Sequence, residues 1–259
     1  MTPPPAAARL RPYETEAIVL RTIAFGETSQ VVHLATPEHG LVAALAKGAC
    51  RPGPDFRGGL ALGTVGAAAL SPRRGAELEL LRSFRLEDRL RGLARGLDRF
   101  YAGCYILDLL RAWMRPALPN PDLYRAGRAA LRSVAEARST SLAAWVVWFE
   151  ARAIAAGGHG PRLTGCAACG RTEADGTAFS PGAGGVVHPE CAPPGPRLRL
   201  DAAGRGALMR IYGASVAELA AEPLSPSAVG RIRQVHDILV PHLLERRPDS
   251  LANVPRPGT

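Results

Sequence analysis

The chain has 259 residues, of which 47% are apolar, so it is long enough for one large domain or two smaller ones. It contains no run of about 18 apolar residues, which excludes a membrane-spanning helix. Residues 1–12 lack the apolar core of a signal peptide, so we expect a cytoplasmic protein. The formal net charge of +9 favours polyanionic partners, nucleic acid before membrane surfaces.

Short runs rich in β-branched residues dominate the part of the chain from residue 13 to residue 84. Turns that contain glycine separate these runs, a pattern typical of short strands. The predicted strands cover residues 15–23, 29–35, 41–46, 58–70 and 77–84. Five short strands in so short a segment predict a small closed barrel as the N-terminal domain, residues 13–84. Residues 1–12 are expected to form a flexible N-terminus.

Helical periodicity replaces the strand pattern beyond residue 84. Apolar residues at three- and four-residue steps from residue 86 to residue 114 predict one long amphipathic helix. Further helix starts are expected where a capping side chain precedes an apolar run, after Asn120, Ser141, Asp201 and Ser225. We assign residues 85–247 to a helical domain and residues 248–259 to a flexible tail.

Two pairs of metal-ligand residues interrupt the helical domain. Cys166-Ala-Ala-Cys169 and His188-Pro-Glu-Cys191 together read C-x2-C-x18-H-x2-C. Thiolate and imidazole ligands in two tight pairs, with a Gly-rich loop between them, are typical of tetrahedral Zn²⁺. Four protein ligands leave no open coordination position, which favours a structural ion over a catalytic one. We therefore predict a zinc-finger module at about residues 160–195 that binds one structural Zn²⁺ per chain.

A zinc-dependent enzyme is the main alternative for this pattern. Zinc deaminases carry H-x-E followed by P-C-x-x-C. Here the H-x-E of His188–Glu190 follows the CxxC pair, and Gly165 stands where the proline is required. The chain also lacks a Walker loop and the GxGxxG, GxSxG and HExxH motifs. A non-enzymatic protein is the default, with a deaminase-like enzyme and a protein-binding adaptor without DNA activity as alternatives.

Basic residues in the loops and strand ends of the predicted barrel are candidates for contacts with nucleic-acid phosphates. The strongest candidate is the segment from Lys47 to Arg51, because Gly48 lets the backbone approach a phosphate between two cations. The other candidates are Arg21, Arg57, Arg73, Arg74 and Arg82. Stacking on bases is expected to be weak, since aromatic residues are scarce in this segment. The alternative is an ordinary solvated surface, because the first 84 residues hold nine basic and seven acidic side chains.

The order of several short motifs resembles the RecO family of bacterial DNA-repair mediators. These motifs are Ala17-Ile-Val-Leu20, Phe25-Gly-Glu27, Thr36-Pro-Glu-His-Gly40, the segment from Lys47 to Arg51, and the metal-ligand pattern. The resemblance covers residues 13–245. Phe25 replaces the usual tyrosine, and His188 stands where zinc-bearing members commonly have cysteine. Some members lack the metal ligands, which implies a structural metal that the shared activity does not need.

The resemblance implies an α+β fold, in which an N-terminal OB-fold β-barrel precedes an α-helical domain that carries the zinc-finger module. It implies a protein that binds single- and double-stranded DNA and anneals complementary strands. The implied partners are RecR, often RecF, and single-strand DNA-binding protein, whose acidic tail would bind the helical domain. Together with RecR and RecF, such a protein would displace single-strand DNA-binding protein and load RecA onto the DNA. Lys47 and Arg51 become the first candidates for DNA contact, in a cytoplasmic protein associated with the nucleoid and not with a membrane.

Overall fold

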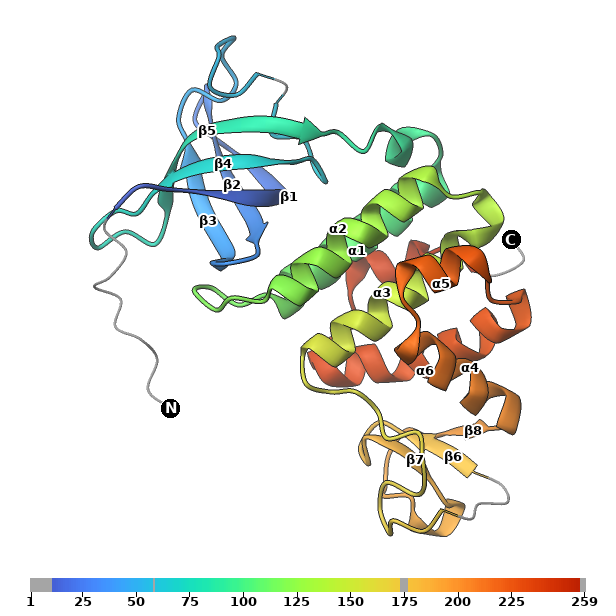
Figure 1. The fold of residues 1–259 in the computed structure, drawn as a ribbon. Helices are drawn as coiled ribbons and strands as arrows, with labels where there is room; N and C mark the ends of the chain where they lie inside the picture. Colours follow the sequence, from blue (N-terminus) through green and yellow to red (C-terminus); the bar gives the residue numbers. More distant parts are fainter. Residues whose placement is uncertain (1–10, 58, 173–176, 257–259) are drawn as a thin grey trace. The chain divides into compact units, whose positions relative to one another are not determined.

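The computed structural model describes residues 11–57, 59–172 and 177–256 (Figure 1). The chain divides into two compact units. The first comprises the residues up to Arg91 together with Leu110–Arg128, and the second comprises Gly92–Leu109 and the residues from Ala129 onward. The division runs through helices α1 (Leu97–Trp113) and α2 (Pro121–Glu136), so each of these helices contributes to both units.

A closed barrel of five strands forms the main part of the first unit. Its strands are β1 (Tyr13–Phe25), β2 (Ser29–Thr36), β3 (Gly40–Ala46), β4 (Val65–Ser71) and β5 (Glu79–Asp88). They close in the order β1-β2-β3-β5-β4, and β3 and β5 are the parallel pair among antiparallel neighbours. The prediction of a small five-stranded barrel at the N-terminal end is thereby confirmed.

The inner face of the barrel is lined by small and branched apolar side chains. Ala17 and Val19 of β1, Val32 and Leu34 of β2, and their counterparts on the other strands form one continuous core. The pairing of β1 with β2 shifts register between Val19 and Arg21, where β1 carries a bulge. This irregularity decides which residues at the end of β1 face outward.

Backbone contacts attach the segment around residue 115 to the barrel within the first unit. The Leu41 amide donates to the carbonyl oxygen of Arg115 at 3.1 Å. Gly40 has a φ of 66°, and a Cβ there would overlap the carbonyl oxygens of Arg115 and Leu118. Only glycine therefore permits this close approach. An ion pair of 2.9 Å between Arg128 of α2 and Glu16 of β1 adds a second contact to the barrel.

Two element boundaries predicted from periodicity are wrong. The long helix expected from residue 86 begins only at Leu97, because β5 continues to Asp88 and a 3-10 turn follows at Arg91–Ala94. Leu90 between them adopts a left-handed conformation with a φ of 45°. The strand expected from residue 58 begins at Val65, after a left-handed turn at Gly63 with a φ of 78°.

The second unit is mainly helical. Besides the ends of α1 and α2, it contains α3 (Leu142–Ala156), α4 (Ala202–Gly213), α5 (Val216–Ala221) and α6 (Pro226–Leu244). Three of the four predicted caps are confirmed: Asn120 accepts from the Leu123 amide at 3.0 Å, Asp201 from the Gly204 amide at 2.7 Å, and Ser225 from the Ala228 amide at 3.2 Å. Helix α3 begins after Ser141, but the Ser141 side chain makes no capping hydrogen bond. Trp148 and Phe149 of α3 are buried in the core.

The end of the described chain differs from the flexible tail expected from residue 248. A 3-10 turn forms at Asp249–Asn253, and Leu251 and Val254 are buried. Their apolar contacts hold this part of the tail, a feature that the low periodicity of the sequence did not indicate. Among the described residues, no helix is long and apolar enough to cross a membrane.

A small sheet interrupts the helices of the second unit between α3 and α4. Strands β6 (Thr177–Ser180), β7 (Gly185–Val187) and β8 (Leu198–Leu200) pair in the order β7-β6-β8. Both pairings are antiparallel. The predicted metal ligands flank these strands, so the inserted module expected from the cysteine spacing is present within an α+β protein.

Candidate metal centre and nucleic-acid interface

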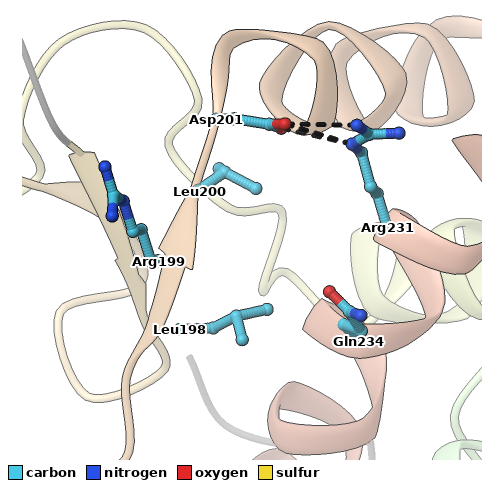
Figure 2. Close-up of a pocket in the computed structure, with 6 residues that line it drawn as sticks. All are labelled: Leu198, Arg199, Leu200, Asp201, Arg231 and Gln234. Atoms are coloured by element: carbon cyan, nitrogen blue, oxygen red, sulfur yellow. Dashed lines mark hydrogen bonds and ion pairs between the residues drawn. The ribbon is translucent and has the colours of Figure 1, made fainter.

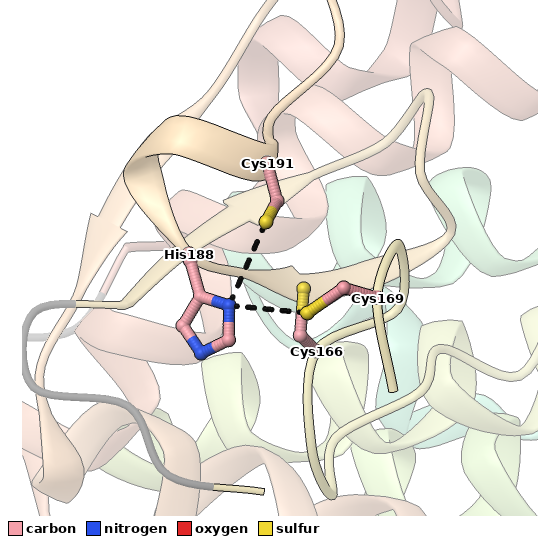
Figure 3. A group of neighbouring side chains, drawn as sticks. All are labelled: Cys166, Cys169, His188 and Cys191. Atoms are coloured by element: carbon pink, nitrogen blue, oxygen red, sulfur yellow. Dashed lines mark hydrogen bonds between the residues drawn. The ribbon is translucent and has the colours of Figure 1, made fainter. Parts of the chain in front are cut away.

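The four predicted metal ligands meet in the inserted module (Figure 3). The sulfur atoms of the three cysteines and a ring nitrogen of His188 all lie within 4.8 Å of one another. His188 Nδ1 lies 3.4 Å from Cys169 Sγ and 3.7 Å from Cys191 Sγ. A tetrahedral Zn²⁺ with Zn–S of about 2.3 Å and Zn–N of about 2.0 Å separates sulfur from nitrogen by about 3.5 Å. Cys166, Cys169, His188 and Cys191 can therefore hold one metal ion.

Tight turns bring the two ligand pairs to the same point. The Cys166 amide donates to the carbonyl oxygen of Arg171 at 2.8 Å, and the Gly170 amide donates to the carbonyl oxygen of Cys166 at 2.9 Å. Gly165 and Gly170 have φ values of 70° and 79°, so both ends of the first turn require glycine-like backbone freedom. The Ala167 amide then donates to Val186 on β7, which fixes the first pair beside the second.

The charge state of the cysteines suits a cation. Arg171 Nε donates to Cys169 Sγ at 3.5 Å and lowers the pKa of that thiol to about 6. The thiolate, which is the metal-binding form, is thus favoured near neutral pH. Burial instead raises the pKa of the Cys191 thiol. Three thiols and one imidazole that lie this close together match the number and type of ligands that a tetrahedral metal site uses.

The predicted phosphate-binding loop is anchored against the turn between β1 and β2. The Gly48 amide donates to Ser29 Oγ at 3.2 Å, and the Cys50 amide donates to the carbonyl oxygen of Thr28 at 3.0 Å. Lys47 and Arg51 are exposed on this loop. Neither side chain has a hydrogen bond or ion pair with any residue that the structure describes, so both cations are available to a ligand.

The other predicted cations are distributed over several parts of the barrel. Arg82 lies one residue beyond Leu81, the β5 partner of Ala46, and its Nε donates to Ser71 Oγ at 2.6 Å. Arg21 pairs across β1 and β2 with His33. Burial lowers the pKa of His33, and the charges of Arg21 and Arg111 lower it further, so Arg111 is a nearby cation that sequence reasoning missed.

The remaining three candidates lie on other loops. Arg57 is exposed in the segment between β3 and β4. A hydrogen bond attaches this segment to β5, because the Phe84 amide donates to the carbonyl oxygen of Asp55 at 2.8 Å. Arg73 and Arg74 are exposed in the turn between β4 and β5. The register of β3 and β5 brings Lys47 and Arg82 to neighbouring positions. Arg51 belongs to the loop of Lys47, where its amide donates to the carbonyl oxygen of Gly48 at 2.9 Å. Arg73 and Arg74 follow Ser71, the residue that Arg82 contacts.

Comparisons with known proteins identify the family of this chain. Family models described as the N-terminal and C-terminal parts of recombination protein O match residues 10–90 and 94–252. The chain belongs to the RecO family of DNA repair proteins. It is 36% identical over 217 residues to a DNA repair protein RecO of Rhodopirellula baltica, covering 82% of this chain and 77% of that protein. The corresponding protein of Desulforudis audaxviator is 32% identical over 257 residues, 96% of this chain and 98% of that protein.

One buried polar network of this RecO family member was not anticipated. Glu150 of α3 is fully buried, and its Oε1 accepts from Arg233 Nη2 at 2.8 Å and from the Tyr105 hydroxyl at 2.6 Å. His236 Nδ1 lies 2.8 Å from Glu150 Oε2. Burial opposes the charge of Glu150, but Arg233, His236 and Tyr105 outweigh it and lower the pKa of the carboxyl. The network joins α1, α3 and α6, and its sequence signal is a glutamate that, apart from Arg152, is the one charged residue of an apolar helix.

A shallow groove lies between the module and α6 of this RecO family member (Figure 2). It has a volume of about 330 Å³ and is lined by Leu198, Arg199 and Leu200 of β8, with Asp201, Arg231 and Gln234 opposite. Arg231 Nη2 lies 3.2 Å from Asp201 Oδ2, and Asp201 also caps α4. These two charges already satisfy one another, so the groove is a structural junction between the module and the helices.

Proposed function

We propose that the chain is a non-enzymatic DNA-binding protein of recombinational repair. It binds single- and double-stranded DNA, anneals complementary strands and, with RecR and often RecF, helps to load RecA onto DNA coated with single-strand DNA-binding protein. The observation that carries this proposal is the pair of exposed cations, Lys47 and Arg51, on a loop anchored to the barrel of a RecO family member. The proposal places this work at the nucleoid, in the cytoplasm.

Phosphate neutralisation supplies the mechanism. Two complementary strands repel each other through their phosphates, and cations that bind those phosphates release counterions and reduce the repulsion. Lys47 and Arg51 flank Gly48, whose φ of 69° is a left-handed conformation that forms a tight turn. Both side chains therefore project from the same short loop. The anchoring bonds from Ser29 and Thr28 hold this loop before DNA binds, which reduces the entropy lost on binding.

Reversing both charges, Lys47→Glu with Arg51→Glu, is expected to lower single-strand affinity on the order of tenfold or more. Each phosphate contact with a single strand contributes about 0.7 to the slope of log affinity against log salt, so the slope should fall by about 1.4. Fluorescence anisotropy with a labelled oligonucleotide at several salt concentrations measures both quantities.

The matched control is Arg246→Glu with Arg247→Glu, an exposed pair after α6 that changes the net charge by the same amount. This control should lose little affinity. If the two double variants behave alike, or if Lys47→Glu with Arg51→Glu leaves the affinity and the salt slope unchanged, the assigned interface is wrong.

A groove in the second unit supports the proposed contact with an acidic protein tail. It has a volume of about 500 Å³ and lies between the start of α3 and the segment that joins α5 to α6. Apolar side chains line it, with the exposed Arg138 at its margin; among them are Ala143, Ala144, Leu224, Pro226 and Val229. An apolar groove beside a cation suits a peptide that combines acidic and apolar side chains.

The metal is proposed to be structural Zn²⁺, one per chain, in the closed set of three cysteines and one histidine. A deaminase-like enzyme would require an open coordination position, so a water ligand in the spectrum of a cobalt-substituted sample would favour that alternative. A protein-binding adaptor would show no retention of DNA at low salt.

A further inference from the structure

One aromatic side chain of the barrel is exposed. Phe25, at the end of β1, is 55% exposed, and Ile23 on the same strand is 40% exposed. The other described aromatic side chains of the barrel pack against other residues. Phe84 is buried in the core, Phe56 packs against that core, and the ring centroid of Tyr13 lies 4.0 Å from that of His39. Phe25 is therefore the one described barrel aromatic that presents most of its surface to a ligand.

The bulge in β1 turns Phe25 outward. Ala17 and Val19 point into the barrel core, so strict alternation would send Ile23 and Phe25 inward as well. The register shift between Val19 and Arg21 reverses this order. Beyond the bulge, Ile23 pairs with Val31 of β2, the neighbour of the core residue Val32. The two apolar side chains thus lie on the outer face, in agreement with their exposure.

Cations flank this apolar strip at both ends. Phe25 pairs with Ser29, whose hydroxyl accepts from the amide of Gly48 in the loop that carries Lys47 and Arg51. At the other end, Arg21 lies two residues before Ile23 on the same face of β1 and is exposed. An exposed aromatic ring between cations is complementary to a chain that alternates unpaired bases with phosphates.

We propose that Phe25 is the base-stacking platform of the interface. An unpaired base lies against its ring and contacts Ile23, while Lys47 and Arg51 hold the adjoining phosphates. This inference rests on the proposed function, because it takes those two cations as the phosphate contacts. The ligand class is single-stranded nucleic acid, since the faces of bases within a duplex are already stacked. One platform adds base contact to a site that composition alone would limit to phosphates.

Phe25→Ala is expected to lower the affinity for single-stranded DNA by about 5- to 150-fold, the range found when a stacking aromatic is removed. The salt slope should stay unchanged, because no phosphate contact is lost. Affinity for an abasic strand of equal length, and for a duplex, should change little. Phe25→Trp should keep the affinity for normal strands, because a larger ring stacks at least as well. Anisotropy titrations with the three DNA probes measure these effects.

Phe100→Ala is the matched control, since Phe100 on α1 is another exposed phenylalanine, with 46% of its surface exposed. It should leave all three affinities unchanged. Lys47→Glu with Arg51→Glu should weaken normal and abasic strands alike, which separates the two proposals. If only Phe25→Ala is without effect, stacking is wrong while the phosphate interface stands; if both variants are without effect, the interface itself is wrong. Equal loss on normal and abasic strands, or loss of a protein partner with DNA binding intact, would also overturn the assignment.

Discussion

Cys166→Ser is expected to release the bound metal and to unfold the inserted module. Cys166 is 1% exposed, and its side chain is one of four ligands that lie within 4.8 Å of one another. Structural Zn²⁺ contributes an apparent free energy of about 10–16 kcal/mol to small zinc domains. The core of the module has few apolar side chains: Ala178 and Val187 are the buried ones that pack with Cys166. Without the metal, so small a core cannot compensate for the entropy of ordering the chain.

Elemental analysis and thermal denaturation test this expectation. The unmodified chain should contain about one zinc per molecule, and Cys166→Ser should contain far less and melt at a lower temperature. Cys50→Ser is the matched control, because Cys50 is an exposed thiol outside the metal site and should keep the full metal content. DNA affinity per folded molecule should be nearly unchanged in Cys166→Ser. A large loss of affinity with the fold intact would make the module a DNA-reading element.

Glu150→Gln is expected to destabilise the second unit by about 3–5 kcal/mol, the cost of breaking a buried ion pair by removing one partner. The substitution keeps the shape of the side chain but leaves Arg233, whose side chain is 6% exposed, with less compensating charge. Asp237 Oδ1, at 3.1 Å from Arg233 Nε, restores part of this charge. Chemical denaturation followed by circular dichroism gives the free energy of unfolding.

The surface pair between Arg132 and Glu136 provides the control for this effect. Both of these side chains are more than two-thirds exposed, at 69% and 68%, so Glu136→Gln should change the free energy of unfolding by about 0.5 kcal/mol or less. If Glu150→Gln is as mild as Glu136→Gln, the buried network does not stabilise the fold.

The same network predicts a dependence of stability on pH. The pKa of Glu150 in the folded chain is lowered from its ordinary value of 4.5. Its ionisation therefore stabilises the fold fully above pH 4.5, and this contribution is lost as the pH falls through the lower pKa of the folded state. The difference in stability between the unmodified chain and Glu150→Gln should shrink below that pH. A difference that stays constant between neutral and acidic pH would contradict the assignment of charge to Glu150.

Local patterns predicted the parts of this protein that local physics determines. The five strands follow from β-branched runs between glycine turns. The two metal-ligand pairs follow from their local spacing, although contacts between distant segments bring the pairs together. The helix boundary near residue 86 was wrong because Leu86, Leu90 and Leu93 fit a helical repeat although the first belongs to β5 and the second to a turn. Periodicity in so short a window cannot separate these possibilities.

Features that depend on tertiary structure were not predictable from one sequence. Glu150 and Arg233 are 83 positions apart, and only the packing of α3 against α6 brings them together. The outward direction of Phe25 depends on the bulge between Val19 and Arg21. No residue type in this segment predicts a bulge at that position. The sequence therefore indicated which residues carry positive charge near the loop, but not that an aromatic ring lies exposed beside them.

Strand annealing by this chain can be measured as the rate at which two complementary oligonucleotides pair in the absence of nucleotide. We expect the chain to accelerate annealing of bare strands and of strands coated with single-strand DNA-binding protein. The acceleration should fall with added salt and should be largely lost in Lys47→Glu with Arg51→Glu. Annealing no faster than the spontaneous rate at low salt, or acceleration that does not depend on these two cations, would contradict the proposed function.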